Sequence, residues 1–326
     1  RLTNEEAFAL QHLFREAGVA NLDWRGGRQR QATPGAFGAA LDRIDDAQAI
    51  VIAGESPEER APVLWLRIRK AALRNGAKIV TAKSANEARD TAGGASRVAL
   101  IWDGADPAQA REYAQAFAGN GELTTYIASE QANARGAEAM GMLPFSGPGY
   151  AAADPGLDAY AMFDAARAGQ LAVLSIFGVN PARNAADPRA AADALDRLPF
   201  LVVSDLFMTE TAQRATLVLP AKGAFEKHGT TLNLAGDLLP VNASLTAPDS
   251  VRSDYEMLAG LAEQLGVSIP SDDQLHRLVV KFAASDPDFV LGDARFGAVT
   301  MASLSRPILS GGGTWQHDPR LAGMRT

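Results

Sequence analysis

Short apolar runs alternate with amphipathic stretches along the first half of the chain. Four runs have the length of buried β-strands, and they cover residues 47–55, 77–82, 95–102 and 124–129. Between them, 59–76 and 106–121 repeat apolar residues at helical spacing, and Gly76 and Gly119 stand where helices usually end. A strand, a helix and a second strand in this order predict parallel pairing.

The same pattern restarts after the Pro- and Gly-rich stretch 143–156. Helices are predicted at 158–170 and 187–199, and strands at 171–178, 200–204 and 216–220. Residues 1–18 also have an amphipathic helical pattern. The sequence therefore predicts an α/β protein with two doubly wound, mostly parallel-sheet domains.

Length and composition fit a soluble globular protein with room for two cores. The chain has 326 residues, of which 47% are hydrophobic and 21% charged. Its apolar runs are much shorter than the ~20 residues needed to cross a bilayer, and its charged N-terminal stretch does not resemble a signal peptide. A formal net charge of -7 argues against binding to nucleic acid. We expect neither membrane insertion nor a nucleic-acid partner.

The sequence offers little for metal or acid-base chemistry. It contains no cysteine, so it has no thiolate for an iron-sulfur cluster, and its four histidines lack metal-ligand spacing. Glu226, Lys227 and His228 form a polar cluster in a glycine-bounded loop, which is more typical of a solvated turn than of a catalytic set. We predict no catalytic and no metal-ligating residue in this chain.

Two similar loops follow strands in the two halves. Residues 54–57 read Gly-Glu-Ser-Pro, and residues 178–181 read Gly-Val-Asn-Pro. Their likeness indicates a pseudo-repeat. Glycine at the carboxyl end of a strand lets a phosphate approach the backbone, and the following helix start offers free N–H groups. The same tetrapeptide is also a good strand-to-helix turn, with asparagine as the cap and proline starting the helix, and the motif alone favours that structural interpretation.

Several ordered motifs accompany the second loop. Residues 205–212 read D-x-F-x-T-E-T-A, Leu219-Pro220 ends a strand, and residues 226–233 read E-x-x-G-T-x-x-N. Upstream, residues 133–144 read N-x-x-G-x-x-x-M-G-x-x-P. Together with the G-x-N-P loop, this order resembles the molybdopterin oxidoreductase superfamily and implies the fold of its formate dehydrogenase and DMSO reductase members.

The resemblance implies where a bis-molybdopterin guanine dinucleotide would lie. The matching positions are Gly54, Ser56, Gly178, Asn180, Asp205, Thr209 and Glu210. Two departures make us interpret them as a vestigial cofactor site. The first loop has Ser56 where the family has asparagine, and the Arg and Gln that usually follow the last motif are missing after Asn233.

One cysteine-free segment separates branches of the superfamily. Residues 21–29 read NLDWRGGRQ and resemble an N-x-D-x-R-x-x-x-Q element of the large peripheral-arm iron-sulfur subunit of NADH:quinone oxidoreductase, respiratory complex I. This resemblance implies a cluster-free structural and assembly portion of an electron-transfer subunit. It further implies iron-sulfur clusters upstream in the parent subunit, no cofactor in this chain, other peripheral-arm subunits as partners, and a cytoplasmic location peripheral to the inner (plasma) membrane.

The resemblance also implies how the chain is divided. Residues 1–30 would join 164–265 in one α/β domain, 31–163 would form an inserted α/β domain, and 266–326 would be a C-terminal remainder. Two other functions stay open from the sequence. One is a fragment of a molybdenum-dependent oxidoreductase such as a formate dehydrogenase catalytic chain, and the other is a stand-alone dinucleotide-binding protein.

Overall fold

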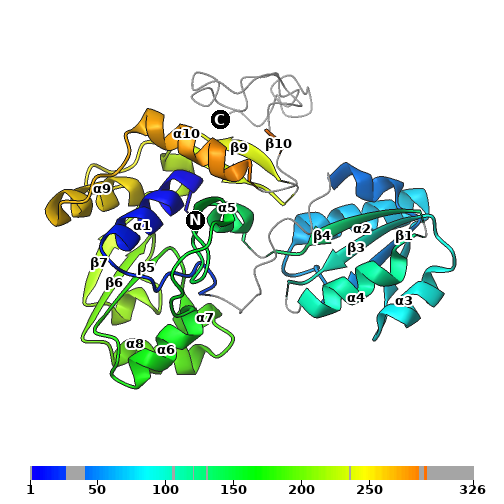
Figure 1. The fold of residues 1–326 in the computed structure, drawn as a ribbon, viewed down its shortest axis with the longest axis horizontal. Coiled ribbons are helices and arrows are strands. Elements are labelled where there is room, and N and C mark those ends of the chain that lie inside the picture. Colours follow the sequence, from blue (N-terminus) through cyan, green and yellow to red (C-terminus); the bar gives the residue numbers. More distant parts are fainter. Residues whose placement is uncertain are drawn as a thin grey trace, which may run out of the picture.

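The computed structural model describes residues 2–26, 41–104, 107–119, 121–129, 131–234, 236–285 and 290–291. Figure 1 shows a smaller lobe on the right, built around one sheet, and a larger lobe on the left that contains the N-terminal helix. Residues 292–326, and therefore most of the predicted C-terminal remainder, lie outside the described residues.

The smaller lobe is a four-stranded parallel sheet with helices on both faces (Figure 1). Its strand order is β2-β1-β3-β4, with β1 at Ala49–Ala53, β2 at Lys78–Thr81, β3 at Arg97–Trp102 and β4 at Glu122–Ile127. Its helices are α2 at Pro62–Asn75, α3 at Ala85–Ala92, α4 at Pro107–Phe117 and the 3-10 helix η1 at Leu41–Asp46. Every residue of β1 is buried, as expected for a central parallel strand covered on both faces.

Successive side chains along these strands point to opposite faces of the sheet, so the core of the smaller lobe has two layers. Ile50 and Ile52 pack with α2 and η1, whereas Val51 packs with α3 and α4. Tyr113 of α4 and Trp102 of β3 are fully buried and supply much of the second layer. The lobe is thus a doubly wound unit with two hydrophobic layers of its own.

The larger lobe begins with a three-stranded parallel sheet in the order β5-β6-β7. These strands are β5 at Val173–Phe177, β6 at Phe200–Asp205 and β7 at Leu217–Pro220. Three helices belong to the unit: α6 at Ala159–Arg167, the short α7 at Pro181–Asn184 and α8 at Pro188–Asp196. Phe163, Leu195 and Val203 lie in one cluster, which binds α6 and α8 to β6.

A second layer of the larger lobe surrounds helix α1 at Asn4–Glu16. It contains the helices α5 at Ala134–Ala139, α9 at Asp254–Leu265 and α10 at Asp272–Ala283, and the strands β8 at Gly229–Leu232, β9 at Asp237–Val241 and β10 at Val290–Leu291. Strands β8 and β9 pair antiparallel. Three further 3-10 turns are η2 at Pro148–Tyr150, η3 at Ala212–Arg214 and η4 at Ala224–Glu226. Leu13, Met140, Leu258 and Val279 share one core around α1.

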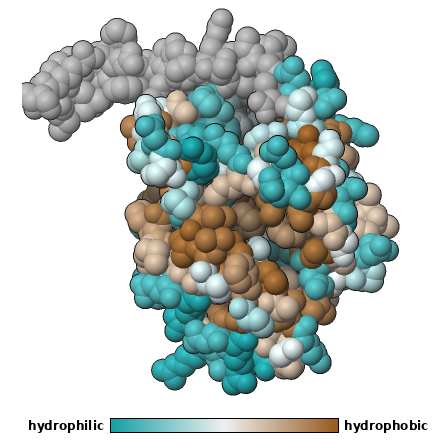
Figure 2. All heavy atoms as spheres, turned by 90° about the vertical axis from the view of Figure 1, so that its left-hand side faces the viewer, coloured by the Kyte–Doolittle hydropathy of each residue, from teal (hydrophilic) through white to brown (hydrophobic). Residues whose placement is uncertain are grey.

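One face of the larger lobe carries a band of hydrophobic residues. Figure 2 views the side that looks to the left in Figure 1, and hydrophobic residues gather across its middle between more hydrophilic margins. Exposed apolar side chains of this lobe include Leu206, Phe207, Met208, Leu217, Phe225, Leu245, Leu261 and Leu265. Among the described residues, no helix is long and apolar enough to cross a membrane.

The structure confirms the predicted α/β class and the mostly parallel sheets. Three details differ. Helix α2 begins at Pro62, later than predicted, because residues 58–60 form a turn. Helix α3 at Ala85–Ala92 and the antiparallel β8-β9 pair were not anticipated. The division into domains stays a prediction. Met140 and Met142 precede the predicted boundary at residue 163, yet they pack with α1, which the prediction places in the other domain.

Candidate functional site

The G-x-N-P loop of the larger lobe joins β5 to α7. Gly178 has a φ of 65°, and its N–H donates to the carbonyl of Ser204 at 2.8 Å, so the loop turns sharply at the carboxyl end of the sheet. The side-chain oxygen of Asn180 accepts hydrogen bonds from the Thr211 hydroxyl at 2.8 Å and from the Thr211 N–H at 3.2 Å. The Asn180 amide nitrogen donates to Glu210 Oε2 at 2.7 Å. Asn180 thus ties this loop to residues 210–211.

The prediction that Asn180 caps its own helix is wrong. Asn180 holds the N-cap position of α7 and Pro181 begins that helix, but the Asn180 side chain makes no capping hydrogen bond there. Instead the buried hydroxyl of Thr211 accepts from the N–H of Ala182 at 3.1 Å. The cap therefore comes from a segment 29 residues away, which the local sequence does not reveal.

Asp205, Thr209 and Glu210 lie in the segment that follows β6. Asp205 Oδ1 accepts from the N–H of Leu206 at 2.7 Å, and the Thr209 hydroxyl lies 3.5 Å from Asp205 Oδ2. The hydrogen bond from Asn180, helped by Arg183 and Arg214, lowers the pKa of Glu210 and keeps it ionised. The structure thus brings five of the seven predicted positions, Gly178 and Asn180 included, to the carboxyl end of the β5-β6-β7 sheet.

Replacing Asn180 by alanine is expected to cost about 1–3 kcal/mol of unfolding free energy, because the buried N–H and hydroxyl of Thr211 lose their acceptor. Urea unfolding followed by circular dichroism measures this cost. Asn184→Ala is the matched control, because Asn184 is exposed at the end of the same helix, and it should stay within about 0.5 kcal/mol of the parent. Equal values for the two variants would contradict a structural role for Asn180.

The other two predicted positions, Gly54 and Ser56, lie in the smaller lobe at the carboxyl end of β1. Gly54 has a φ of 99°, and a Cβ placed on it would lie 2.2 Å from Asp103 Oδ2. The N–H of Glu55 donates to that same oxygen at 2.9 Å. The Ser56 hydroxyl accepts from the N–H of Glu58 at 3.3 Å, which closes the turn. A carboxylate of this chain therefore occupies the approach to the first loop.

This arrangement bears directly on the guanine dinucleotide implied by the family resemblance. A phosphate at such a loop is bound by free backbone N–H groups, and the N–H of Glu55 already donates to Asp103. Asp103 is only 5% exposed, so its carboxylate would also repel a phosphate with little screening by water. As it stands, the first loop does not fit the phosphates of that cofactor.

The cysteine-free segment that distinguishes the branches acts as an internal clamp. The Arg25 guanidinium binds both carboxylate oxygens of Asp23, at 2.7 and 2.9 Å. Asp23 also accepts from the N–H of Ala159 at the start of α6, and Asn21 accepts from the N–H of Leu157. A Cβ on Gly156 would lie 2.0 Å from the carbonyl oxygen of Ala20, so the two segments touch directly. Residues 27–29 of this motif lie outside the described residues.

A buried ionic cluster adjoins strand β6 of the parallel sheet in the larger lobe. The Lys227 ammonium contacts Glu6 Oε2 at 2.5 Å and Asp254 Oδ2 at 3.8 Å, and all three side chains are at most 3% exposed. Ser204 donates to Asp254, and the N–H of Asp254 donates to Glu6 at 3.2 Å. The cluster therefore joins α1, β6, α9 and the segment before β8.

The interpretation of residues 226–228 as a solvated turn is wrong for its central residue. Lys227 points into the protein because Glu6 and Asp254 offer it two buried carboxylates. Glu226 accepts from the N–H of Gly223 in a local turn, and His228 is exposed. Sequence reasoning also missed Asp103, whose partner is 48 residues away, although an aspartate directly after a buried strand was a signal. The motif located Thr211 but did not reveal its contact with Asn180, which is 31 residues away.

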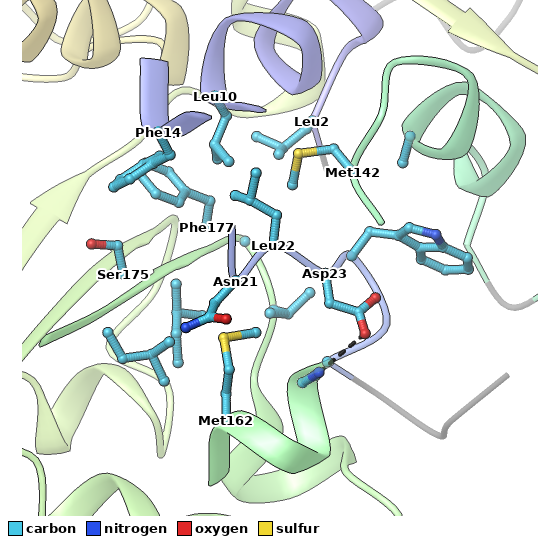
Figure 3. Close-up of a pocket in the computed structure, with 18 of the residues that line it drawn as sticks. Leu2, Leu10, Phe14, Asn21, Leu22, Asp23, Met142, Met162, Ser175 and Phe177 are labelled. Carbon is cyan, nitrogen blue, oxygen red and sulfur yellow. Dashed lines mark hydrogen bonds between the residues drawn. The ribbon is translucent and has the colours of Figure 1, made fainter. Parts of the chain in front are cut away.

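An apolar cavity of about 290 Å³ opens beside β5. Figure 3 shows Leu10 and Phe14 of α1 on one side, Met162 of α6 on the opposite side, and Phe177 of β5 between them. Asn21 and Asp23 of the clamp also line the cavity. Among the described residues, no group of three or more His, Cys, Asp or Glu side chains is placed to hold a metal ion.

The parallel sheets, the paired loops and the motif order define a class of protein. A sequence model of the molybdopterin oxidoreductase family matches residues 1–92 and 94–264. The chain belongs to the molybdopterin oxidoreductase family.

Individual relatives fall in more than one branch of that family. One subunit of the NADH-quinone oxidoreductase of Streptomyces coelicolor is 28% identical over 310 positions, which cover 76% of this chain and 37% of that protein. The F420-dependent formate dehydrogenase 1 subunit alpha of Methanococcus maripaludis is 33% identical over 42% of this chain and 23% of its own length. The assimilatory nitrate reductase catalytic subunit of Bacillus subtilis is 34% identical over 34% and 16%. The match thus spans well under half the length of each of these relatives.

Proposed function

We propose that this chain is the cluster-free structural and assembly portion of the large electron-transfer subunit in the peripheral arm of NADH:quinone oxidoreductase. In this role it keeps the molybdopterin-type fold without molybdenum. The intact parent passes electrons from NADH along iron-sulfur clusters bound upstream, while the present residues hold subunits together. The observation that carries the proposal is the carboxylate of Asp103 at the first loop, where a cofactor phosphate would approach.

The second loop supports the same interpretation. Both polar atoms of the Asn180 side chain are committed to residues 210–211, and Asp205 accepts from the backbone of its own loop. These contacts stabilise the turn without any ligand. A cofactor that used Asn180 or Asp205 would have to replace hydrogen bonds that the protein already makes, which removes most of the gain from binding.

The extent of similarity favours NADH:quinone oxidoreductase over the molybdenum enzymes. The NADH-quinone oxidoreductase relative matches 76% of this chain, whereas the formate dehydrogenase and nitrate reductase relatives match 42% and 34%. The second candidate, a fragment of a molybdenum-dependent formate dehydrogenase, draws on the higher identity of 33% within its shorter match. A guanine nucleotide bound to the purified protein would favour that candidate.

The proposal also implies partners and a location for this chain. We infer that the chain contacts other subunits of the peripheral arm and that the assembled complex lies at the cytoplasmic side of the inner (plasma) membrane. The similarity to the NADH-quinone oxidoreductase relative and the exposed apolar side chains of the larger lobe support a role in a multi-subunit complex.

Conservative changes at Asp205 or Glu226 should leave electron transfer in the assembled complex intact, and any loss should fall on the amount of complex that assembles. Each carboxylate accepts a hydrogen bond from a nearby backbone N–H, so the conservative changes Asp205→Asn and Glu226→Gln should cost at most about 1 kcal/mol of stability. NADH oxidation with an artificial acceptor, normalised to cluster content by EPR of the whole complex, measures chemistry apart from assembly.

The normalised rate of both variants is expected to equal that of the parent complex, with an equal or smaller amount of complex assembled. A normalised rate at least about tenfold lower, with cluster signals and assembly intact, corresponds to a loss of about 1.4 kcal/mol of transition-state stabilisation. That result would mean that Asp205 or Glu226 takes part in the chemistry, and it would contradict the proposal that this chain is a structural portion of the subunit.

A further inference from the structure

The β8-β9 hairpin is fixed to the larger lobe. Leu232 and Leu238 are buried in the core around α1. The side-chain oxygen of Asn133 accepts from the N–H of Leu232 at 2.8 Å, and the Asn133 amide nitrogen donates to the carbonyl of Leu2 at 3.1 Å. The hairpin is therefore held by the start of α1 and by the segment that enters α5.

The turn of this hairpin is closed by its own residues. Asn233 Oδ1 accepts from the N–H of Asp237 at 2.8 Å, and the Asn233 amide nitrogen donates to Asp237 Oδ2 at 2.9 Å. The N–H of Gly236 donates to the carbonyl of Asn233 at 3.1 Å, and Gly236 has a φ of 86°, which suits glycine. The conformation of the turn thus rests on contacts within the hairpin itself.

Leu234 in this turn contacts the smaller lobe. Its partly buried side chain packs against the hydrophobic layer that contains Ile50 and Ile52. Within the described part of the chain, every other member of that layer comes from residues 41–128. Figure 1 shows that one end of β9 reaches the side of the larger lobe next to the smaller one. Arg135 of α5, which is 8% exposed, donates to the carbonyl of Leu234 at 2.9 Å.

Few other contacts fix how the two lobes are oriented. Among the described elements, the extensive contacts between helices and strands fall inside one lobe or the other. Each lobe has hydrophobic layers of its own, and the chain passes between the lobes before η1 and after β4. Domains that share a small interface move relative to each other unless specific contacts prevent it. The contact at Leu234 therefore has a large influence on the orientation of the lobes.

We propose that Leu234 and Arg135 form a latch that holds the smaller lobe in one orientation relative to the larger lobe. Arg135 is the positioning residue, because its hydrogen bond fixes the backbone of the turn. Leu234 supplies the contact, since its apolar side chain leaves water only while the lobes are together. The loops after β1 and β5 lie on different lobes, so the latch also sets the separation between these two loops.

The latch can be tested by measuring distances between the lobes. The chain has no cysteine, so nitroxide labels attach only where cysteine is introduced. Asn86→Cys on α3 and Gln264→Cys on α9 place one label at an exposed position of each lobe. Double electron–electron resonance on the full chain then gives the distribution of label distances. We expect one narrow distribution for the latched protein, and a distribution at least about twofold wider in Leu234→Ser and in Arg135→Gln.

Two further variants separate the latch from the hairpin. Leu239→Ser changes another partly buried leucine of β9, which is not among the described residues that pack against the smaller lobe. Its distance distribution should stay as narrow as that of the parent. Leu234→Met keeps an apolar contact with the smaller lobe and should also stay narrow. Circular dichroism should show unchanged secondary structure in Leu234→Ser, because each lobe keeps its own core.

Four outcomes would overturn the proposal. The parent distribution could already be as wide as that of Leu234→Ser, or Leu234→Ser could stay narrow. Equal widening in Leu234→Ser and Leu239→Ser would assign the effect to the hairpin as a whole. Loss of secondary structure in Leu234→Ser would make Leu234 part of a core that folding requires. A narrow distribution in Arg135→Gln alone would exclude Arg135 from the latch. None of these outcomes depends on whether the chain belongs to an electron-transfer subunit.

Discussion

Lys227→Met is expected to destabilise the protein by about 3–5 kcal/mol, because Glu6 and Asp254 would remain buried without their cation. Both carboxylates are at most 3% exposed, so water cannot replace the lost ammonium group. Methionine has a similar length and no charge, and the change therefore tests the ion pair more than the packing. Urea unfolding monitored by circular dichroism gives the free energy.

Lys222→Met is the matched control for this experiment. Lys222 pairs with Glu256 at 3.0 Å, but the two side chains are 23% and 46% exposed. Ion pairs with this exposure contribute about 0–1 kcal/mol, so the control should unfold close to the parent. Equal destabilisation by the two changes would contradict the assignment of Lys227 as the central charge of a buried cluster.

The second large effect is expected at the clamp. Asp23→Ala should cost about 3–5 kcal/mol, because it removes the buried carboxylate that binds the buried guanidinium of Arg25 through two hydrogen bonds. It also removes the acceptor for the first N–H of α6. Thermal unfolding by calorimetry should show a lower melting temperature.

Asp164→Ala provides the comparison on the same helix. Asp164 pairs with Arg167, and both side chains are more than 40% exposed, so its loss should cost no more than about 1 kcal/mol. If Asp23→Ala and Asp164→Ala behave alike, the cysteine-free motif does not act as a structural clamp. Its likeness to the element of the respiratory enzyme would then need another explanation.

Local patterns predicted the parallel sheets well, because apolar runs report burial directly. The run at 95–102 became the buried strand β3, and the run at 200–204 became β6. Helix α3 was missed although a signal was present. The Ser84 side chain accepts from the N–H of Glu87, and this Ser-x-x-Glu spacing is the usual sign of a helix start. Its low apolar content hid the helix from a search for periodicity.

The candidate site was only partly predictable, for a different physical reason. The motifs located Asn180, Asp205 and Glu210, but their partners depend on contacts between segments far apart. Lys227 illustrates the limit, since its carboxylate partner Glu6 is 221 residues away. Asp103 is a second case, because its effect on the first loop arises only when β1 and β3 become neighbours.

We propose that the loops after β1 and β5 of this family member no longer hold a molybdopterin guanine dinucleotide. The most direct measurement is the molybdenum and guanine content of the full chain, purified from cells that make the cofactor. A molybdenum formate dehydrogenase from the same cells is the positive control. We predict a colourless protein with neither molybdenum nor guanine in stoichiometric amount. About one molybdenum and two guanine nucleotides per chain, lost in Asn180→Ala, would contradict the account, since a bound ligand stabilises and travels with the folded state.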